Sequence, residues 1–113
     1  MTDDYLDNIR YLNFQRCLDL VIEYREDIGD PCPAWPKEDF DRVSYSRFAV
    51  DEIISLLMKN SHKTVCQVLE EFKYEMGLGC SKYIRNHENE KIFTYGYSVA
   101  VDLLDRLSAM GEI

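Results

Sequence analysis

The sequence contains no long hydrophobic run, and its first residues, Met1-Thr2-Asp3-Asp4, are acidic rather than basic. A helix that crosses a bilayer needs about 20 consecutive, mostly apolar residues, and a signal peptide begins with positive charge. The sequence therefore predicts a cytoplasmic chain that contacts no membrane. Four cysteines are present, but none forms a Cys-x-x-Cys pair, so we expect reduced thiols in that compartment.

Basic residues are fewer than acidic ones, 13 against 21, and they are scattered along the chain. Contacts to nucleic-acid phosphates are made by clustered Lys and Arg. A net charge of −8 therefore argues against direct binding of nucleic acid. Because negative charge favours association with a basic surface, we expect a protein partner with such a surface.

Residues that carry out chemistry are also scarce. The two histidines, His62 and His87, lie in polar links. Their spacing from Cys66 and Cys80 matches no common zinc site, and the glycines lack the spacing of a phosphate-binding loop. A nucleophilic Cys or Ser would have few bases to activate it. We therefore predict no metal, cofactor or catalytic residue, with an enzyme whose site forms only in three dimensions as an alternative.

Hydrophobic residues make up 46% of the 113 residues, enough for one core in one domain of residues 1–113. Their three-and-four spacing predicts amphipathic helices. The predicted helices run from Asp3 to about Ile28, from between Ser44 and Ser46 to Asn60-Ser61, from the capping box Thr64–Gln67 to Gly77 and Gly79, and from about Glu90 to Met110. We expect the two glycines to adopt left-handed backbone angles. The predicted fold is all-α, a small bundle of about four helices with one long Pro-containing connection.

Each predicted helix has an apolar face for the core. The residues expected there are Tyr11, Phe14, Leu18, Val21, Ile22 and Ile28 in the first, Val50, Ile53, Ile54, Leu57 and Met58 in the second, Val65, Val68, Leu69, Phe72 and Met76 in the third, and Ile92, Phe93, Val99, Ala100, Leu103, Leu104 and Leu107 in the fourth. Gly96 and Ala100, four residues apart, would let another helix approach closely. A symmetric homodimer is therefore a further alternative.

Negative charge is concentrated at the start of the chain. Residues 1–30 hold eight acids and three arginines, a net charge of −5. The acids that we expect to bind a partner are Asp3, Asp4, Asp7, Asp19, Glu23, Glu26 and Asp27. A solvated helix face is the simpler explanation of the same pattern.

Aromatic residues supply a second group of candidates for an interface. Tyr and Trp dominate protein interfaces, and with eight tyrosines in the chain we expect several to be exposed. The candidates are Tyr5, Tyr11, Tyr24, Tyr45, Tyr74, Tyr83, Tyr95 and Tyr97, of which we assign Tyr5 and Tyr24 on the first predicted helix to the interface. The tyrosines equally fit the rim of a small core. Trp35, between Pro33 and Pro36, either covers the open end of the bundle or anchors a partner; the rarity of exposed Trp favours the first interpretation.

The closing segment, Lys91 to Leu104, combines an aromatic-Gly-aromatic step with an apolar helix. It resembles the ends of short uncharacterised helical proteins encoded by Gram-positive gut bacteria and by their phages and mobile elements. The resemblance implies a setting in which small acidic proteins inhibit host defence nucleases, as anti-CRISPR and anti-restriction proteins do. The expected function is therefore that of an interaction module that occupies a basic surface of a nucleic-acid enzyme.

Overall fold

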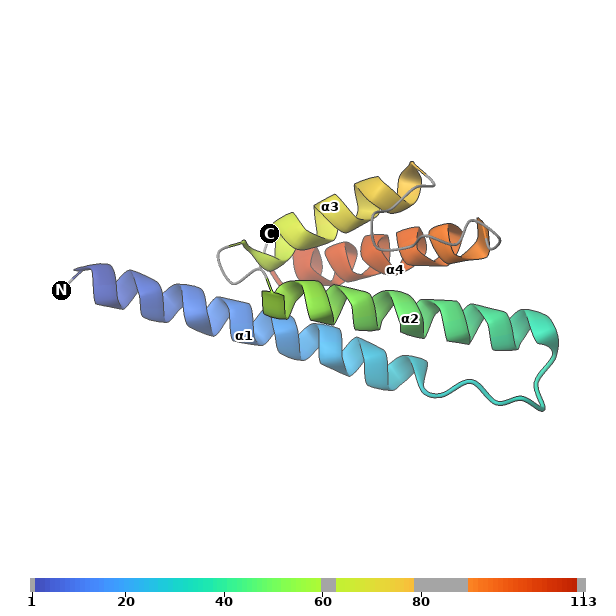
Figure 1. The fold of residues 1–113 in the computed structure, drawn as a ribbon. Helices are drawn as coiled ribbons and strands as arrows, with labels where there is room; N and C mark the ends of the chain where they lie inside the picture. Colours follow the sequence, from blue (N-terminus) through green and yellow to red (C-terminus); the bar gives the residue numbers. More distant parts are fainter. Residues whose placement is uncertain (1, 60–62, 79–89, 112–113) are drawn as a thin grey trace.

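In the part of the chain that it describes, the computed structural model has four α-helices, arranged as a bundle (Figure 1). They are α1 (Thr2–Ile28), α2 (Lys37–Lys59), α3 (Val65–Gly77) and α4 (Glu90–Ala109). The structure describes residues 2–59, 63–78 and 90–111, with side chains from Phe14 onward except that of Glu90. Since no strand occurs in these ranges, the predicted all-α class and the small helical bundle are confirmed.

One hydrophobic core lies between the four helices. Its most deeply buried aliphatic side chains are Val21 of α1, Val50, Ile53 and Leu57 of α2, Leu69 of α3, and Val99, Leu103 and Leu107 of α4. Every residue predicted to be buried on α3 and α4 is buried. Because a fully buried aliphatic side chain contributes about 1.5–3 kcal/mol, this shared core is the main favourable contribution to stability.

Two residues predicted for the core lie at the surface instead. Ile22 of α1 is 38% exposed and Met58 of α2 is 66% exposed. Each lies at the edge of its apolar face, where the three-and-four spacing does not distinguish buried from exposed positions. Other neighbours are buried in their place, namely Cys17 and Tyr24 on α1 and Ala49 and Leu56 on α2.

The third helix begins as predicted and ends differently. The Thr64 hydroxyl accepts a hydrogen bond from the Gln67 amide at 3.1 Å, and the Gln67 side chain accepts one from the Thr64 amide at 2.9 Å, which confirms the capping box. The prediction of a left-handed Gly77 is wrong. Gly77 is the last residue of α3, and Leu78 follows with a right-handed φ of −78°, its amide bonded to the Tyr74 carbonyl at 3.1 Å. Gly79 lies outside the described residues.

The prediction that the second helix begins between Ser44 and Ser46 is wrong, because α2 begins at Lys37. The Pro36 carbonyl accepts a hydrogen bond from the amide four residues on at 3.0 Å, as the residue before a helix does. Two acidic residues in the first turn complement the positive end of the helix dipole. The Ser44 hydroxyl caps nothing and is buried, without a hydrogen-bond partner among the described residues. The Pro-containing connection is therefore shorter than predicted.

The first part of α1 projects beyond the other three helices (Figure 1). Arg25 forms an ion pair with Asp51 of α2, and Arg47 of α2 donates to the Gly29 carbonyl at 2.5 Å. This antiparallel register places the end of α2 level with the middle of α1. Phe14 is the first described side chain of α1 that packs on the core. The projection helps to give the molecule its elongated extents of 56 × 27 × 22 Å.

Gly96 lets a helix approach closely, as predicted, but that helix is α3 of the same chain. A Cβ atom on Gly96 would lie 2.8 Å from the Met76 sulfur and 3.1 Å from its Cγ. Ala100 is fully buried. The two residues are thus used inside the bundle, and they offer no surface to a second chain.

Neither a membrane-spanning helix nor a disulfide occurs among the described residues. Among the described ranges, no helix combines the length and the apolar character that crossing a bilayer requires. Cys17, Cys32 and Cys66 form no disulfide. Cys80 lies outside the described residues.

A Gly96→Val substitution tests the close packing of α3 on α4. The added side chain would overlap Met76, so we expect the free energy of unfolding to fall by about 1–3 kcal/mol, measured by urea denaturation. Ser98→Val places the same side chain on an exposed position of α4 and is the matched control. Equal losses at the two positions would contradict the packing argument.

Candidate interaction surface

Three carboxylates lie on the side of α1 that faces away from the core. Asp19, Glu23 and Glu26 are all exposed, and their spacing of four and three residues places them on one helical face. We call these three residues the acidic face. Asp19 accepts a hydrogen bond from Gln15 at 2.9 Å. Glu23 and Glu26 form no hydrogen bond or ion pair with other described residues.

The remaining acids predicted to bind a partner do not join this group. Asp27 is exposed, but its carboxylate lies 3.8 Å from the Arg106 guanidinium of α4. The side chains of Asp3, Asp4, Asp7 and Tyr5 lie outside the described residues, although the backbone of all four belongs to α1. Of the predicted acids, the structure therefore brings Asp19, Glu23 and Glu26 together on one unobstructed face.

Tyr24 is not part of the exposed surface, which corrects the prediction that it contacts a partner. It is only 8% exposed and belongs to the core. Its hydroxyl donates a hydrogen bond to Asp102 of α4 at 3.1 Å, and the Arg106 guanidinium lies 4.7 Å from its ring centroid. Arg106 also pairs with Asp27 of α1. Tyr24 thus helps to fasten α1 to α4.

Burial raises the pKa of Tyr24 from 10.0 to about 12. The largest cause is the loss of solvent around the phenol, which penalises the phenolate. The nearby Asp102 carboxylate raises the pKa further by repulsion and by its hydrogen bond, while Arg106 lowers it. Tyr24 therefore folds as the neutral phenol and acts as a hydrogen-bond donor.

Trp35 does not cover the core, so the interpretation favoured from the sequence is wrong. Its side chain is 42% exposed and is absent from the residues packed on the core. The Trp35 amide donates to the Cys32 carbonyl at 3.0 Å, which closes a β-turn with Pro33 at its favoured second position. The turn holds the indole in the link between α1 and α2, where it is accessible to a partner.

The described tyrosines divide into packed and exposed ones. Tyr45 of α2 and Tyr95 of α4 stack with ring centroids 6.1 Å apart and an interplanar angle of 9°, and both are half-buried. Tyr74 is 68% exposed and Tyr97 is 42% exposed. Of the tyrosines with described side chains, only these last two present a largely accessible ring.

An exposed apolar area lies where α3 ends beside α4. Tyr74 lies in the last turn of α3 and Leu78 directly follows the helix, and both are more than half exposed. Gly77 lies between them in sequence, and the position of its missing Cβ is 3.5 Å from the Tyr97 ring. The sequence did not predict an exposed Leu78, because this residue lies between the two glycines that were expected to end the helix.

Groups able to hold a metal ion are absent from the described ranges, where no three His, Cys, Asp or Glu side chains converge. His62 and His87, the histidines considered for such a site, lie outside these ranges. Comparison of the chain with protein-family models, curated proteins and solved structures found no match. The features that bear on function are therefore the exposed ones, the acidic face of α1 and Trp35.

Titration of Tyr24 provides a pH test of the contact between α1 and α4. Its pKa is higher in the folded chain than in the unfolded one, so the stabilisation is fully present below pH 10 and is lost as the pH rises toward about 12. We expect the free energy of unfolding of Tyr24→Phe to be about 0.5–1.5 kcal/mol lower near neutral pH. As the pH rises from 10 toward about 12, the free energy of unfolding should fall less for the variant than for the wild type, because the variant has no phenol to ionise. Urea denaturation at a series of alkaline pH values measures this. Parallel curves would contradict this assignment.

Replacement of Trp35 distinguishes a core residue from an exposed one. We expect Trp35→Ala to change the free energy of unfolding by less than about 1 kcal/mol, as surface substitutions do. Leu57→Ala, at a fully buried position, should cost about 2–5 kcal/mol and serves as the reference. A comparable loss for Trp35→Ala in thermal or urea denaturation would show that the indole is part of the core.

Proposed function

We propose that the chain is a protein-interaction module, without catalytic chemistry of its own, that binds a basic surface of a partner through the acidic face of α1. The observation that carries the proposal is the grouping of Asp19, Glu23 and Glu26 on one exposed face, with Glu23 and Glu26 unpaired among the described residues. Unpaired carboxylates raise the local negative potential and steer a basic partner toward this side of the molecule.

A nucleic-acid enzyme is the class of partner that we propose, because its nucleic-acid-binding surface is basic. Along a helix, residues three and four apart are separated by about 4.5 and 6 Å. Phosphates along one DNA strand are separated by about 3.4 Å along the axis. The acidic face is thus less densely charged than DNA. This supports occupation of a basic surface more than strict imitation of a duplex.

The proposed biological role follows from this partner class and from the resemblance of the closing helix. An inhibitor of the anti-CRISPR or anti-restriction kind would use such a face to block a defence nuclease. Trp35 would supply an apolar contact outside the acidic face, since exposed Trp residues often anchor interfaces. The turn restrains the backbone at Trp35, so less backbone entropy would be lost when the residue is buried.

A charge reversal on the acidic face tests the proposal. We expect Glu23→Lys/Glu26→Lys to weaken capture of a protein partner from a Gram-positive host lysate by at least tenfold, because attraction becomes repulsion at two positions. The partner's affinity for the wild type should also fall with added salt, which titration with the purified partner would measure.

The matched control is Glu70→Lys/Asp105→Lys, which makes the same change in net charge at exposed positions of α3 and α4. This variant should bind like the wild type. Equal effects of the two double variants would show that net charge alone matters. Unchanged binding by Glu23→Lys/Glu26→Lys would refute the assignment of the acidic face.

A further inference from the structure

The projecting part of α1 has the features of a segment that pairs with another chain. We call residues 2–13 the arm. At 1.5 Å per residue the arm is about 18 Å long, and Figure 1 shows it extending past the ends of the other helices. Isolated helices of this length are only marginally stable in water. In the sequence, Tyr5, Ile9 and Leu12 follow the spacing of one helical face.

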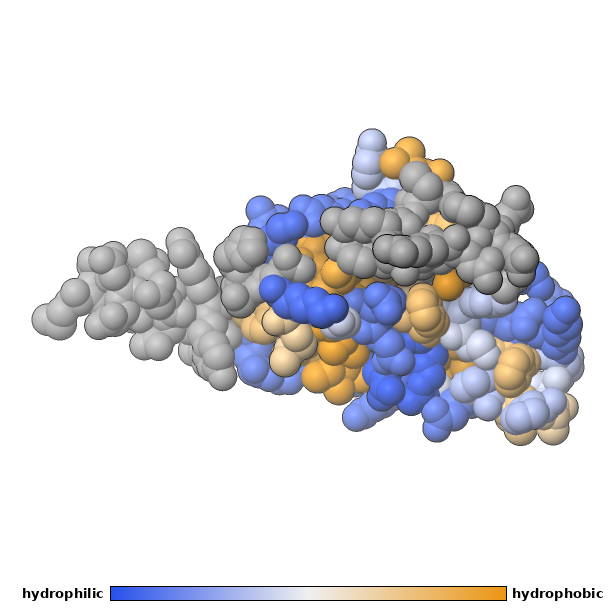
Figure 2. Space-filling view, in the orientation of Figure 1, coloured by the Kyte–Doolittle hydropathy of each residue, from blue (hydrophilic) through white to orange (hydrophobic). Residues whose placement is uncertain are grey.

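An exposed apolar area lies at the base of the arm. It comprises Phe14, Ile22 and Met58, and we call it the root patch. Met58 is 66% exposed, Ile22 is 38% exposed, and Phe14 is half-buried. The register set by Arg25 and Asp51 places Met58 level with the stretch of α1 between Phe14 and Ile22. Figure 2 shows hydrophobic surface at this place, beside the grey end of α1.

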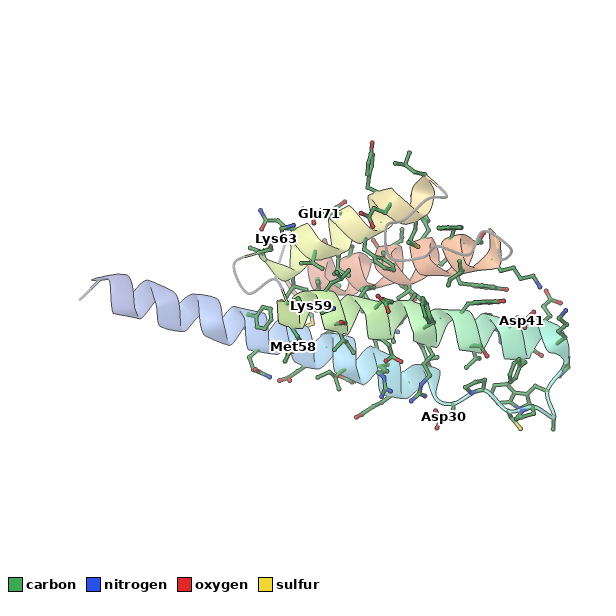
Figure 3. All side chains as sticks on the ribbon, viewed as in Figure 1. Asp30, Asp41, Met58, Lys59, Lys63 and Glu71 are labelled. Atoms are coloured by element: carbon green, nitrogen blue, oxygen red, sulfur yellow. The ribbon has the colours of Figure 1, made fainter. Side chains whose placement is uncertain are left out.

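Charges at the arm and at the root patch are complementary. The arm carries Asp3, Asp4 and Asp7 with one arginine. Lys59 follows Met58 at the end of α2, where Figure 3 shows the two side by side next to α1. Lys63 lies near the same end of the bundle and pairs with Glu71 at 2.9 Å. Asp19 also lies near the root patch, but its carboxylate accepts a hydrogen bond from the Gln15 amide.

We propose that two copies of the chain form an antiparallel pair in which the arm of each lies against the root patch of the other. A two-fold axis relates the two contacts. The arm of the first copy lies on the root patch of the second, and the arm of the second lies on the root patch of the first. This pairing covers the exposed Met58 and Ile22 and brings the acidic arm to Lys59 of the second copy. This interface adjoins the acidic face, because Ile22 lies about one turn from Asp19 and from Glu26 on α1, but it does not depend on the proposed basic partner.

The other apolar surfaces fit a second copy less well. Gly96 already lies against α3, and Ala100 is fully buried. The area around Tyr74 and Leu78 has no projecting segment of the chain that would complement it among the described residues. The arm and the root patch are thus paired by the acidic sequence of the arm, by the exposed Met58 and Ile22, and by the neighbouring Lys59.

Light scattering over a range of concentrations tests the pairing. Interfaces formed by short helices bury areas at the lower end of the about 1,200–2,000 Å² of specific complexes, so we expect a reversible monomer–dimer equilibrium. Met58→Asp should raise the dissociation constant of the dimer at least tenfold, because the new carboxylate would repel the acidic arm of the second copy. Tyr74→Asp introduces the same charge at an equally exposed position and should leave the constant unchanged.

Zero-length carbodiimide cross-linking identifies the contact itself. In an equal mixture of labelled and unlabelled chains, we expect links between arm carboxylates and Lys59 to join chains of different isotope content. A monomer at every concentration would overturn the proposal, as would a dimer that Tyr74→Asp disrupts and Met58→Asp does not. Neither experiment contains the basic partner, so the two proposals can fail separately.

Discussion

At Gly96 the backbone of α4 lies directly against the Met76 side chain of α3, and the rest of the bundle depends on that close contact. Without a side chain at this position, the apolar faces of α3 and α4 meet at a distance that excludes water. Ala100, one turn further along, is fully buried. The resulting pair of helices provides the surface on which Ile53 and Leu57 of α2 are buried.

The first helix is attached to this arrangement by a different kind of contact. Val21 and Leu18 enter the core, but much of the specificity comes from polar groups near the end of α1. Tyr24 donates to Asp102, and Arg25 pairs with Asp51. Exposed ion pairs contribute little energy, so their main effect is to fix the register of α1 against its neighbours. That register leaves the start of α1 beyond the bundle.

Both functional proposals follow from this attachment of α1. Because one side of the helix is buried, Asp19, Glu23 and Glu26 are held on the opposite side in a fixed row. Because the other described helices end near Phe14, the arm extends beyond them (Figure 1). The two surfaces lie on different parts of one helix. A pair of chains could therefore present two acidic faces at once, which would strengthen binding to a partner with two basic sites.

The sequence alone determined the helical class, the capping box at Thr64 and the buried faces of α3 and α4, because these features arise from local hydrogen bonds and from spacing along one helix. It also located the acids of the acidic face. Only the tertiary structure decided that Tyr24 is buried, that Met58 and Trp35 are exposed, and that Gly96 serves packing within one chain. Residues at the edge of an apolar face are buried or exposed according to which helix lies beside them. The start of α2 at Lys37 does not belong with these, since Pro36, the two acids of the first turn and the three-residue spacing of Phe40 and Val43 all favour a helix there. Contacts between residues distant in sequence therefore set the surface on which function depends.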